Sequence, residues 1–446
     1  MKTKSRKKGA ILITAVVLAT GLAIALGSFI ALCVSTARLS NSSFNFNSAL
    51  NLCDAGLEHA MVAINAGDYS WSSRSIGGAT ALTRTFGPFD LGNGMEGYAD
   101  VAIFEHTSEQ PRIVAQGRTV GSLGASITKQ VEVVLRRRSS YETGLVAKET
   151  VELIGNNVIV DSYDSENPLY STGGKYDAAK RKDGGSVASG IVKEVDTGVS
   201  LGNADVWGKV STSGSKIVYK PNGSVLGLDS PTGIKVDPNR VTKNFKGSFF
   251  GKEAPTGTWT ADYRAGDPIP ATLGATGGST LYRMENLSLS GNNVLTIQGD
   301  VTLVMPSIGS GDALSVTGNA SIVLESGATL SIYVEGNVKI AGNGITNPGL
   351  PKDLRIFGTS DIVTQTIEYS GNGSGAAVID APNAIVTLGG GGSVGSLSGS
   401  VVAKQIKLNG HYPFHYDEAL KRLGDGNPMR LGLWREITTA AQLVSF

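Results

Sequence analysis

The stretch that decides the fold of most of this chain is GNASIVLESGATLSIYVEGNVKIAGN, residues 318–343. Apolar and polar residues alternate in it over short segments, and each segment ends in Gly or Gly-Asn. A period of two predicts strands with one buried face, and Gly and Asn tolerate the positive φ that sharp corners require. Gly318, Gly327 and Gly336 follow one another at intervals of nine residues. Three such segments would form one coil of about 20–30 residues, the usual length of a solenoid repeat.

The same pattern extends over the C-terminal two-thirds of the chain. It recurs in residues 287–305, and weaker copies contain the pairs Gly155-Asn156 and Gly202-Asn203. We therefore expect a parallel β-helix, or solenoid, over residues 141–446, because the strands are apolar on one face and clear two-residue hairpins are absent. A β-sandwich is the alternative, since it gives the same alternation. Residues 226–280 hold five prolines and little periodicity, which indicates an irregular insert that crosses or wraps the solenoid.

Composition and charge agree with a β-rich exported protein. Glycine makes up 59 of 446 residues, about twice its usual share of about 7%, and only 17% of the residues are charged. Five of the basic residues lie within residues 1–9, so 34 basic residues face 38 acidic ones in the remainder. A mildly acidic exported part argues against nucleic-acid binding.

The N-terminus predicts a membrane segment. Residues 10–37 contain no charged side chain, and Ala10 to Val34 would span roughly 37 Å as a helix, enough to cross a bilayer. The basic residues 1–9 should stay cytoplasmic, so the rest of the chain faces outward.

Three export signals fit this segment. A cleavable signal peptide could use Ala23-Ile24-Ala25, but the apolar run continues beyond it. A lipoprotein signal could use Cys33, but Leu32 stands before it where a small residue is expected. The third is a prepilin leader, residues 1–9, with cleavage between Gly9 and Ala10 and the whole apolar helix retained.

The helix is expected to continue beyond the membrane, to about Asn65. An apolar stripe at helical spacing is followed by Gly67 as a C-cap; it consists of Phe46, Leu50, Cys53, Leu57, Met61 and Ile64. Cys33 and Cys53 would lie roughly 30 Å apart on this helix, so they cannot form a disulfide.

Two motifs resemble the N-terminus of PilX-type minor pilins of type IV pili, and are also similar to the K-type minor pseudopilin of type II secretion. They are KKGAILI, residues 7–13, and ALNLCDAGLEHA, residues 49–60, of which Asp54-Ala55-Gly56-Leu57-Glu58 is the more specific part. The resemblance implies cleavage by prepilin peptidase with methylation of the new N-terminus, and assembly with other pilin or pseudopilin subunits. It also implies Glu at mature position five, where this chain has Thr14. A subunit without that charge is expected at or near the end of a fibre, because it cannot pair with the amine of a subunit above it.

A small head is expected between the helix and the solenoid, over residues 68–140. Residues 68–94 are rich in Gly, Ser and Thr and indicate a loop. Three strands follow, and we expect them to form an antiparallel sheet on the outer half of the helix; they are Tyr98–His106, Arg112–Val120 and Ile127–Leu135. Arg136-Arg137-Arg138 then indicates a solvated domain boundary.

Several polar groups suggest chemistry, each with a simpler structural interpretation. His411 and His415 with Asp417 and Glu418 could bind a metal, but Pro413 disfavours a helix there, so we expect His415 and Asp417 to cap the solenoid and hold no metal. Three acidic side chains lack the spacing of a calcium loop and are expected to form turns; they are Asp161, Asp164 and Glu166. The glycines of Gly390-x-Gly392-x-x-Gly395 precede a strand instead of a helix, so no dinucleotide is expected.

Motifs of the C-terminal part also resemble a β-helical domain found after PilX-type N-termini; they are DSYDS (161–165), LSIYVEG (330–336), APNA (381–384) and FHYDEAL (414–420). The expected function is that of a minor pilin-like structural subunit, without enzymatic activity or cofactor, that anchors in a pilus or pseudopilus and displays the solenoid for fibre initiation or adhesion. We expect it in the bacterial inner membrane and, after assembly, in a surface fibre, with a carbohydrate or other surface ligand unidentified. A membrane-anchored β-helix enzyme acting on polysaccharide is the alternative.

Overall fold

The computed structural model describes residues 4–92, 94–108, 110–121, 126–137, 139–247, 249–306, 311–360, 365–371, 374–390, 395–423, 429–438 and 444. Of residues 4–10, 137, 156, 157 and 374 it describes the backbone only. The chain forms two compact units, one of residues 1–138 with 426–446 and one of residues 139–425.

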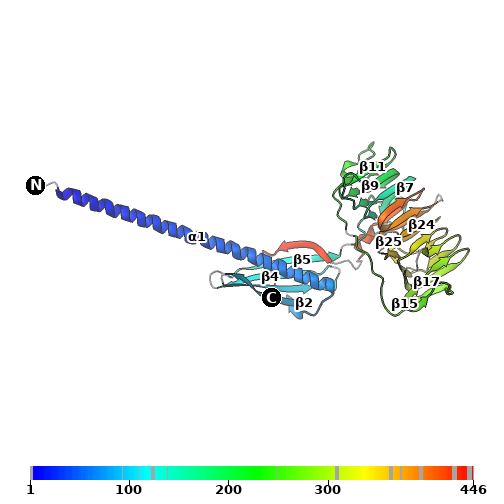
Figure 1. The fold of residues 1–446 in the computed structure, drawn as a ribbon, viewed down its shortest axis with the longest axis horizontal. Helices are drawn as coiled ribbons and strands as arrows, with labels where there is room; N and C mark the ends of the chain where they lie inside the picture. Colours follow the sequence, from blue (N-terminus) through cyan, green and yellow to red (C-terminus); the bar gives the residue numbers. More distant parts are fainter. Residues whose placement is uncertain are drawn as a thin grey trace. The chain divides into compact units, whose positions relative to one another are not determined.

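The first unit begins with a single long helix, α1 (Lys4–Ala66), of 63 residues (Figure 1). It ends as expected at Gly67, whose φ of 67° is the left-handed conformation of a helix C-cap. The amide of Asp68 donates to the carbonyl of Ala63 at 2.9 Å and completes the cap. Cys53, Leu57 and Ile64 of the predicted stripe are buried, and Leu50 and Met61 are partly buried. Phe46 stays 38% exposed.

A six-stranded antiparallel sheet packs on the second half of α1. Its strands, in spatial order, are β1 (Ser72–Ile76), β2 (Ala79–Gly92), β3 (Met95–Phe104), β4 (Arg112–Gly121), β5 (Thr128–Arg137) and β28 (Met429–Glu436). The face toward the helix carries a row of aligned apolar side chains, Leu82, Ile103, Ile113 and Val133. Burial of this face against α1 supplies the core of the unit.

Two features of this sheet were missed in the sequence. Residues 68–94, expected as a loop, contain β1 and β2, joined through Gly77 and Gly78 with φ of 59° and 84°. Successive positive φ values fit a tight hairpin turn. The Gly-, Ser- and Thr-rich composition belongs to the edge strand β1 and its neighbour β2, whose side chains are mostly exposed. The last strand, β28, pairs with β5, so the chain returns to the head and the solenoid does not extend to residue 446 as expected.

The second unit is the expected parallel solenoid. Its strands are β6 (Leu145–Ala147), β7 (Val151–Tyr163), β8 (Val187–Ser189), β9 (Thr197–Trp207), β10 (Val210–Thr212), β11 (Lys216–Tyr219), β12 (Ser224–Leu226), β13 (Val241–Thr242), β14 (Ala261–Tyr263), β15 (Thr272–Met284), β16 (Leu287–Leu289), β17 (Val294–Met305), β18 (Asp312–Val316), β19 (Ser321–Leu324), β20 (Thr329–Val334), β21 (Asn337–Ile340), β22 (Ile345–Thr346), β23 (Leu354–Gly358), β24 (Thr366–Ser370), β25 (Ser374–Gly389), β26 (Ser396–Leu408) and β27 (Phe414–Asp417). Short 3-10 turns are η1 (Ala178–Lys180), η2 (Pro238–Arg240), η3 (Pro351–Asp353) and η4 (Glu418–Arg422).

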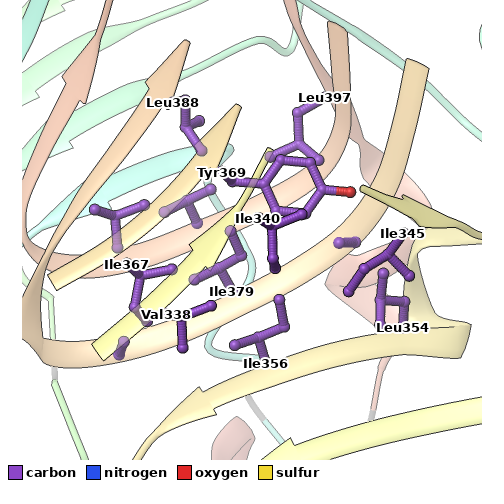
Figure 2. Close-up of a cluster of buried hydrophobic side chains, with 14 of the residues drawn as sticks. Val338, Ile340, Ile345, Leu354, Ile356, Ile367, Tyr369, Ile379, Leu388 and Leu397 are labelled. Carbon is purple, nitrogen blue, oxygen red and sulfur yellow. The ribbon is translucent and has the colours of Figure 1, made fainter. Parts of the chain in front are cut away.

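Successive coils align inward-facing residues at the predicted interval. Ile332 pairs with Ile356, Ile356 with Ile379, and Ile379 with Val401, so these coils take 24, 23 and 22 residues. The paired side chains are fully buried and form continuous apolar rows, several of which Figure 2 shows. Gly318 and Gly327 adopt φ of 69° and 79° at corners between strands.

The order of the coils differs from the order of the chain. The last long strand, β26, pairs with β25 on one side and with β6 and β7 on the other. The chain therefore enters the solenoid at an internal coil and builds outward through β9 to β12. It then runs to the far end of the tube, where β14 and β15 begin the coils that return (Figure 1). The predicted insert contains this crossing, but solenoid strands lie at both of its ends: β13 pairs with β10, and β14 begins at Ala261.

Candidate functional site

The most distinctive surface of the first unit is the exposed apolar part of α1. The large apolar side chains between Ile11 and Leu39 are between 46% and 70% exposed. The helix is long and apolar enough, by length and composition, to cross a membrane. Exposed apolar surface of this extent requires lipid or other apolar surfaces around it.

The predicted cleavage point lies inside this helix. Gly9 and Ala10 belong to the continuous helical backbone of α1, and their side chains lie outside the described residues. Thr14 is exposed one turn further on. It lies in a shallow apolar surface with Ile11, Ala15, Leu18, Ala19 and Leu22. The helix thus presents Thr14 to whatever surrounds the apolar segment.

The motif Asp54–Glu58 lies where α1 contacts the sheet. Asp54 and Glu58 are exposed, whereas Gly56 and Leu57 are buried. A Cβ on Gly56 would lie 2.8 Å from Cγ2 of Val101, so this glycine lets β3 approach the helix backbone. The motif residues that face the sheet therefore have a packing role, and the two acids face away from it.

Cys53 takes part in the same contact. Its Sγ accepts a hydrogen bond from the amide of Gly117 at 3.0 Å and lies 3.3 Å from the carbonyl oxygen of Lys129. Burial raises the pKa of the thiol to about 12. A thiol held neutral in this way is a packing group and a poor nucleophile.

His415 and Asp417 lie on β27, inside the solenoid instead of at its end. This strand pairs with β26 on one side and with β7 on the other, so the two residues do not cap the solenoid as expected. They lie at the seam, which is the place where the last coil of the chain pairs with the first. Asp417 is the N-cap of η4; its Oδ1 accepts from the amides of Ser165 and Ala419 at 3.0 and 3.1 Å. Burial raises the pKa of this carboxyl group.

His415 belongs to a buried network that sequence reasoning missed. Its Nδ1 lies 2.6 Å from Oδ1 of Asp161, which is fully buried. The hydroxyl of Tyr176 donates to the other oxygen of Asp161 at 2.6 Å, and its ring stacks on the imidazole at 3.5 Å between centroids. The sequence pointed to His415 and Asp161 only as separate candidates. Their contact depends on the pairing of β27 with β7, which joins residues 254 positions apart.

The other polar candidates form structural ion pairs. Asp164 and Glu166 both bind Arg422, and Glu166 also binds Lys352 at 3.0 Å, so these acids join loops of the solenoid. Within the described residues no three His, Cys, Asp or Glu side chains form a group that could hold a metal ion. Gly392 of the glycine-rich motif lies outside the described residues, and Gly395 is followed by β26.

Comparisons with known proteins add one sequence match and distant similarities to solved structures. A family model described as a domain of unknown function (DUF7305) matches residues 261–423, the arm of the solenoid from β14 to η4. Among curated proteins, none matches this chain.

Two of these solved structures are similar at low identity. The competence-associated pilin ComZ from Thermus thermophilus is 12% identical, with 87% of this chain and 97% of that chain covered and a TM-score of 0.19. The DUF3494 domain of an ice-binding protein from Shewanella frigidimarina is 10% identical, with 62% and 95% covered and a TM-score of 0.23. Similarities at these TM-scores carry no argument for the fold or the function of this chain.

Proposed function

We propose that this protein is a minor pilin-like structural subunit of a type IV pilus or a secretion pseudopilus. One observation carries the proposal: α1 is a single helix whose outer half is packed on a small sheet and whose first half is exposed and apolar. Such a helix can lie in a bilayer before assembly and in a bundle of similar helices afterwards, with no change of fold. The basic residues 1–9 support an orientation in a bacterial inner membrane with the N-terminus on the cytoplasmic side.

In this function the solenoid is the displayed part, for adhesion or for fibre initiation. It performs no catalysis. The polar groups near His415 support this interpretation, since Asp161 is bound by His415 and Tyr176 and Asp164 is bound by Arg422. The rival enzyme needs acidic or basic groups gathered and accessible in a groove. Two pockets on the solenoid have no carboxylate among the described residues that line them.

The decisive experiment is N-terminal sequencing of the protein extracted from membranes. Cleavage by prepilin peptidase should leave Ala10 as the first residue, with methylation of its amine. Gly9→Leu should leave the full-length precursor in the membrane, whereas Gly27→Leu, in the same helix, should be processed normally. A first residue near Ala25 would identify an ordinary signal peptide and refute the proposal.

The position in the fibre follows from Thr14. A label on the solenoid should appear at one end of isolated fibres with few copies each. Decoration along the shaft would contradict the placement at the end while leaving the pilin-like role intact.

A further inference from the structure

Two adjoining pockets open on the solenoid beside the seam. The first, of about 290 Å³, is lined by Ser398 and His415 from the last coils, by Lys175 and Tyr176 from the loop after β7, and by Gly375. The second, of about 280 Å³, shares Lys175 and Gly375 with the first and continues to Tyr369. Each volume lies near the lower limit of about 300 Å³ for small-molecule sites, so each pocket suits one ring-sized unit. Together they suit two linked units.

Charge in these pockets favours an anion. Lys175 is exposed and lines both pockets, and it forms no ion pair with any other described residue. The described lining contains no carboxylate, and Asp161 behind it is bound by both His415 and Tyr176. An ammonium group without a protein counter-charge is free to bind the carboxylate of a ligand.

The first pocket also offers groups that recognise hydroxyls. The Nδ1 of His415 is directed to Asp161, which leaves Nε2 as the ring nitrogen available to a ligand. Ser398 is 9% exposed and is register partner to His415 on the neighbouring strand. Its side chain lines the first pocket, and a hydroxyl can donate one hydrogen bond and accept others.

Two glycines keep the pockets open. A Cβ on Gly375 would lie 2.7 Å from the hydroxyl oxygen of Tyr369, and one on Gly174 would lie 2.8 Å from Cδ2 of Leu350. The wall at Gly375 is therefore backbone next to the ring of Tyr369, and the wall at Gly174 is backbone next to the side chain of Leu350. Flat apolar surface beside hydroxyl-binding groups suits the face of a pyranose ring.

We propose that the two pockets bind two consecutive units of an acidic saccharide. The carboxylate lies at Lys175, and ring hydroxyls lie at Ser398 and at Nε2 of His415. This inference rests on the proposed function only in that the solenoid is displayed outward. Binding is measured on unassembled protein, so its failure would leave the processing at Gly9 and the incorporation into fibres untouched.

The test uses the full-length protein in detergent micelles and three uronic-acid disaccharides, namely those of galacturonate, mannuronate and glucuronate. At least one should bind in calorimetry or ligand-observed NMR, and its methyl ester should not. Lys175→Glu should weaken binding at least about tenfold, since it removes a charge-assisted hydrogen bond and adds repulsion. Lys175→Arg, which keeps the positive charge, should bind about as tightly as the unaltered protein. Ser398→Ala should bind more weakly.

The matched control is Lys193→Glu, the same charge change at an exposed lysine outside both pockets, which should bind as the unaltered protein does. Equal binding of acid and methyl ester, or unchanged binding by Lys175→Glu, would overturn the assignment. So would the absence of binding to all three disaccharides at millimolar concentration. Sulfate binding as tightly at equal ionic strength would reduce the pockets to a general anion site and refute the saccharide.

Discussion

At the scale of single residues, glycine determines how closely the helix approaches the sheet in the first unit. A Cβ on Gly117 of β4 would lie 1.9 Å from the carbonyl oxygen of Ala49 in α1. The amide of the same glycine donates to Cys53, so the contact is both steric and polar. Neither partner can move without separating the helix from the sheet.

Gly117→Ala should therefore destabilise the head by about 1–3 kcal/mol, the usual cost of overpacking. Thermal unfolding of the full chain in detergent measures it. Gly251→Ala is the control, because nothing lies within 4 Å of a Cβ there, and it should leave the transition unchanged. Equal unfolding temperatures for the two variants would show that the backbone of α1 does not lie in close contact with Gly117 of β4.

Asp417 provides a second prediction at this scale, on pH. Burial raises its pKa in the folded state, so the unfolded chain releases this proton at lower pH than the folded chain does. Below its unfolded pKa the carboxyl group therefore does not lower the free energy of unfolding. Its destabilising effect grows as the pH rises from the unfolded pKa to the folded pKa.

Asp417→Asn should remove this cost while the amide oxygen keeps accepting from Ser165 and Ala419. The stability of the variant relative to the unaltered protein should rise with pH above about 4 and level off beyond the folded pKa. Chemical denaturation at a series of pH values measures the difference. A relative stability that falls over this range would mean that the buried carboxylate is favoured by its amide donors.

At the scale of elements, α1 is tied to the last strand of the chain. The side chain of Asn65, at the end of the helix, accepts from the amide of Met429 at 2.6 Å and lies 3.3 Å from its carbonyl oxygen. Met429 is itself buried in the core between helix and sheet. This pair of hydrogen bonds aligns the start of β28 beside β5.

Asn65→Ala should loosen β28 at a cost of about 0.5–1.5 kcal/mol for each lost hydrogen bond. Limited proteolysis followed by mass spectrometry should then detect faster release of the C-terminal strand. Asn51→Ala, at an exposed position of the same helix, is the control. Identical cleavage rates would show that pairing with β5 alone holds the strand.

At the scale of the whole molecule, the second unit contains its own core and its ends meet. The hydroxyl of Ser139 donates to the carbonyl of Leu420 at 2.7 Å, so the chain enters and leaves at neighbouring points. A unit with a continuous buried core and adjacent ends is expected to fold by itself.

Residues 139–425 expressed alone should give a soluble protein with a β-rich circular dichroism spectrum and a cooperative thermal transition. The boundary matters, because residues 141–446 would add β28 without the strand it pairs with. Ile332→Asp in this fragment should cost several kcal/mol by burying a charge in the apolar tube. A spectrum dominated by helix, or an unfolded fragment, would contradict the division into two units.

The sequence alone determined the local structure of this protein. The apolar run after residues 1–9, the stripe ending at Gly67 and the alternation around Gly318–Asn343 predict helix, cap and coils correctly, because these depend on periodicity and on the conformations that glycine permits. The mostly exposed strands β1 and β2 escaped prediction, since their few buried side chains do not produce an alternating apolar pattern.

Only the tertiary structure decided which segments meet. The pairing of β26 with β6 and β7, the return of β28 to β5, and the contact of His415 with Asp161 each join residues more than 250 positions apart. Parallel strands of similar apolar pattern can pair in many orders with nearly equal local energy. The order that forms is set by the summed burial of the whole tube and by polar partners that satisfy one another across the seam.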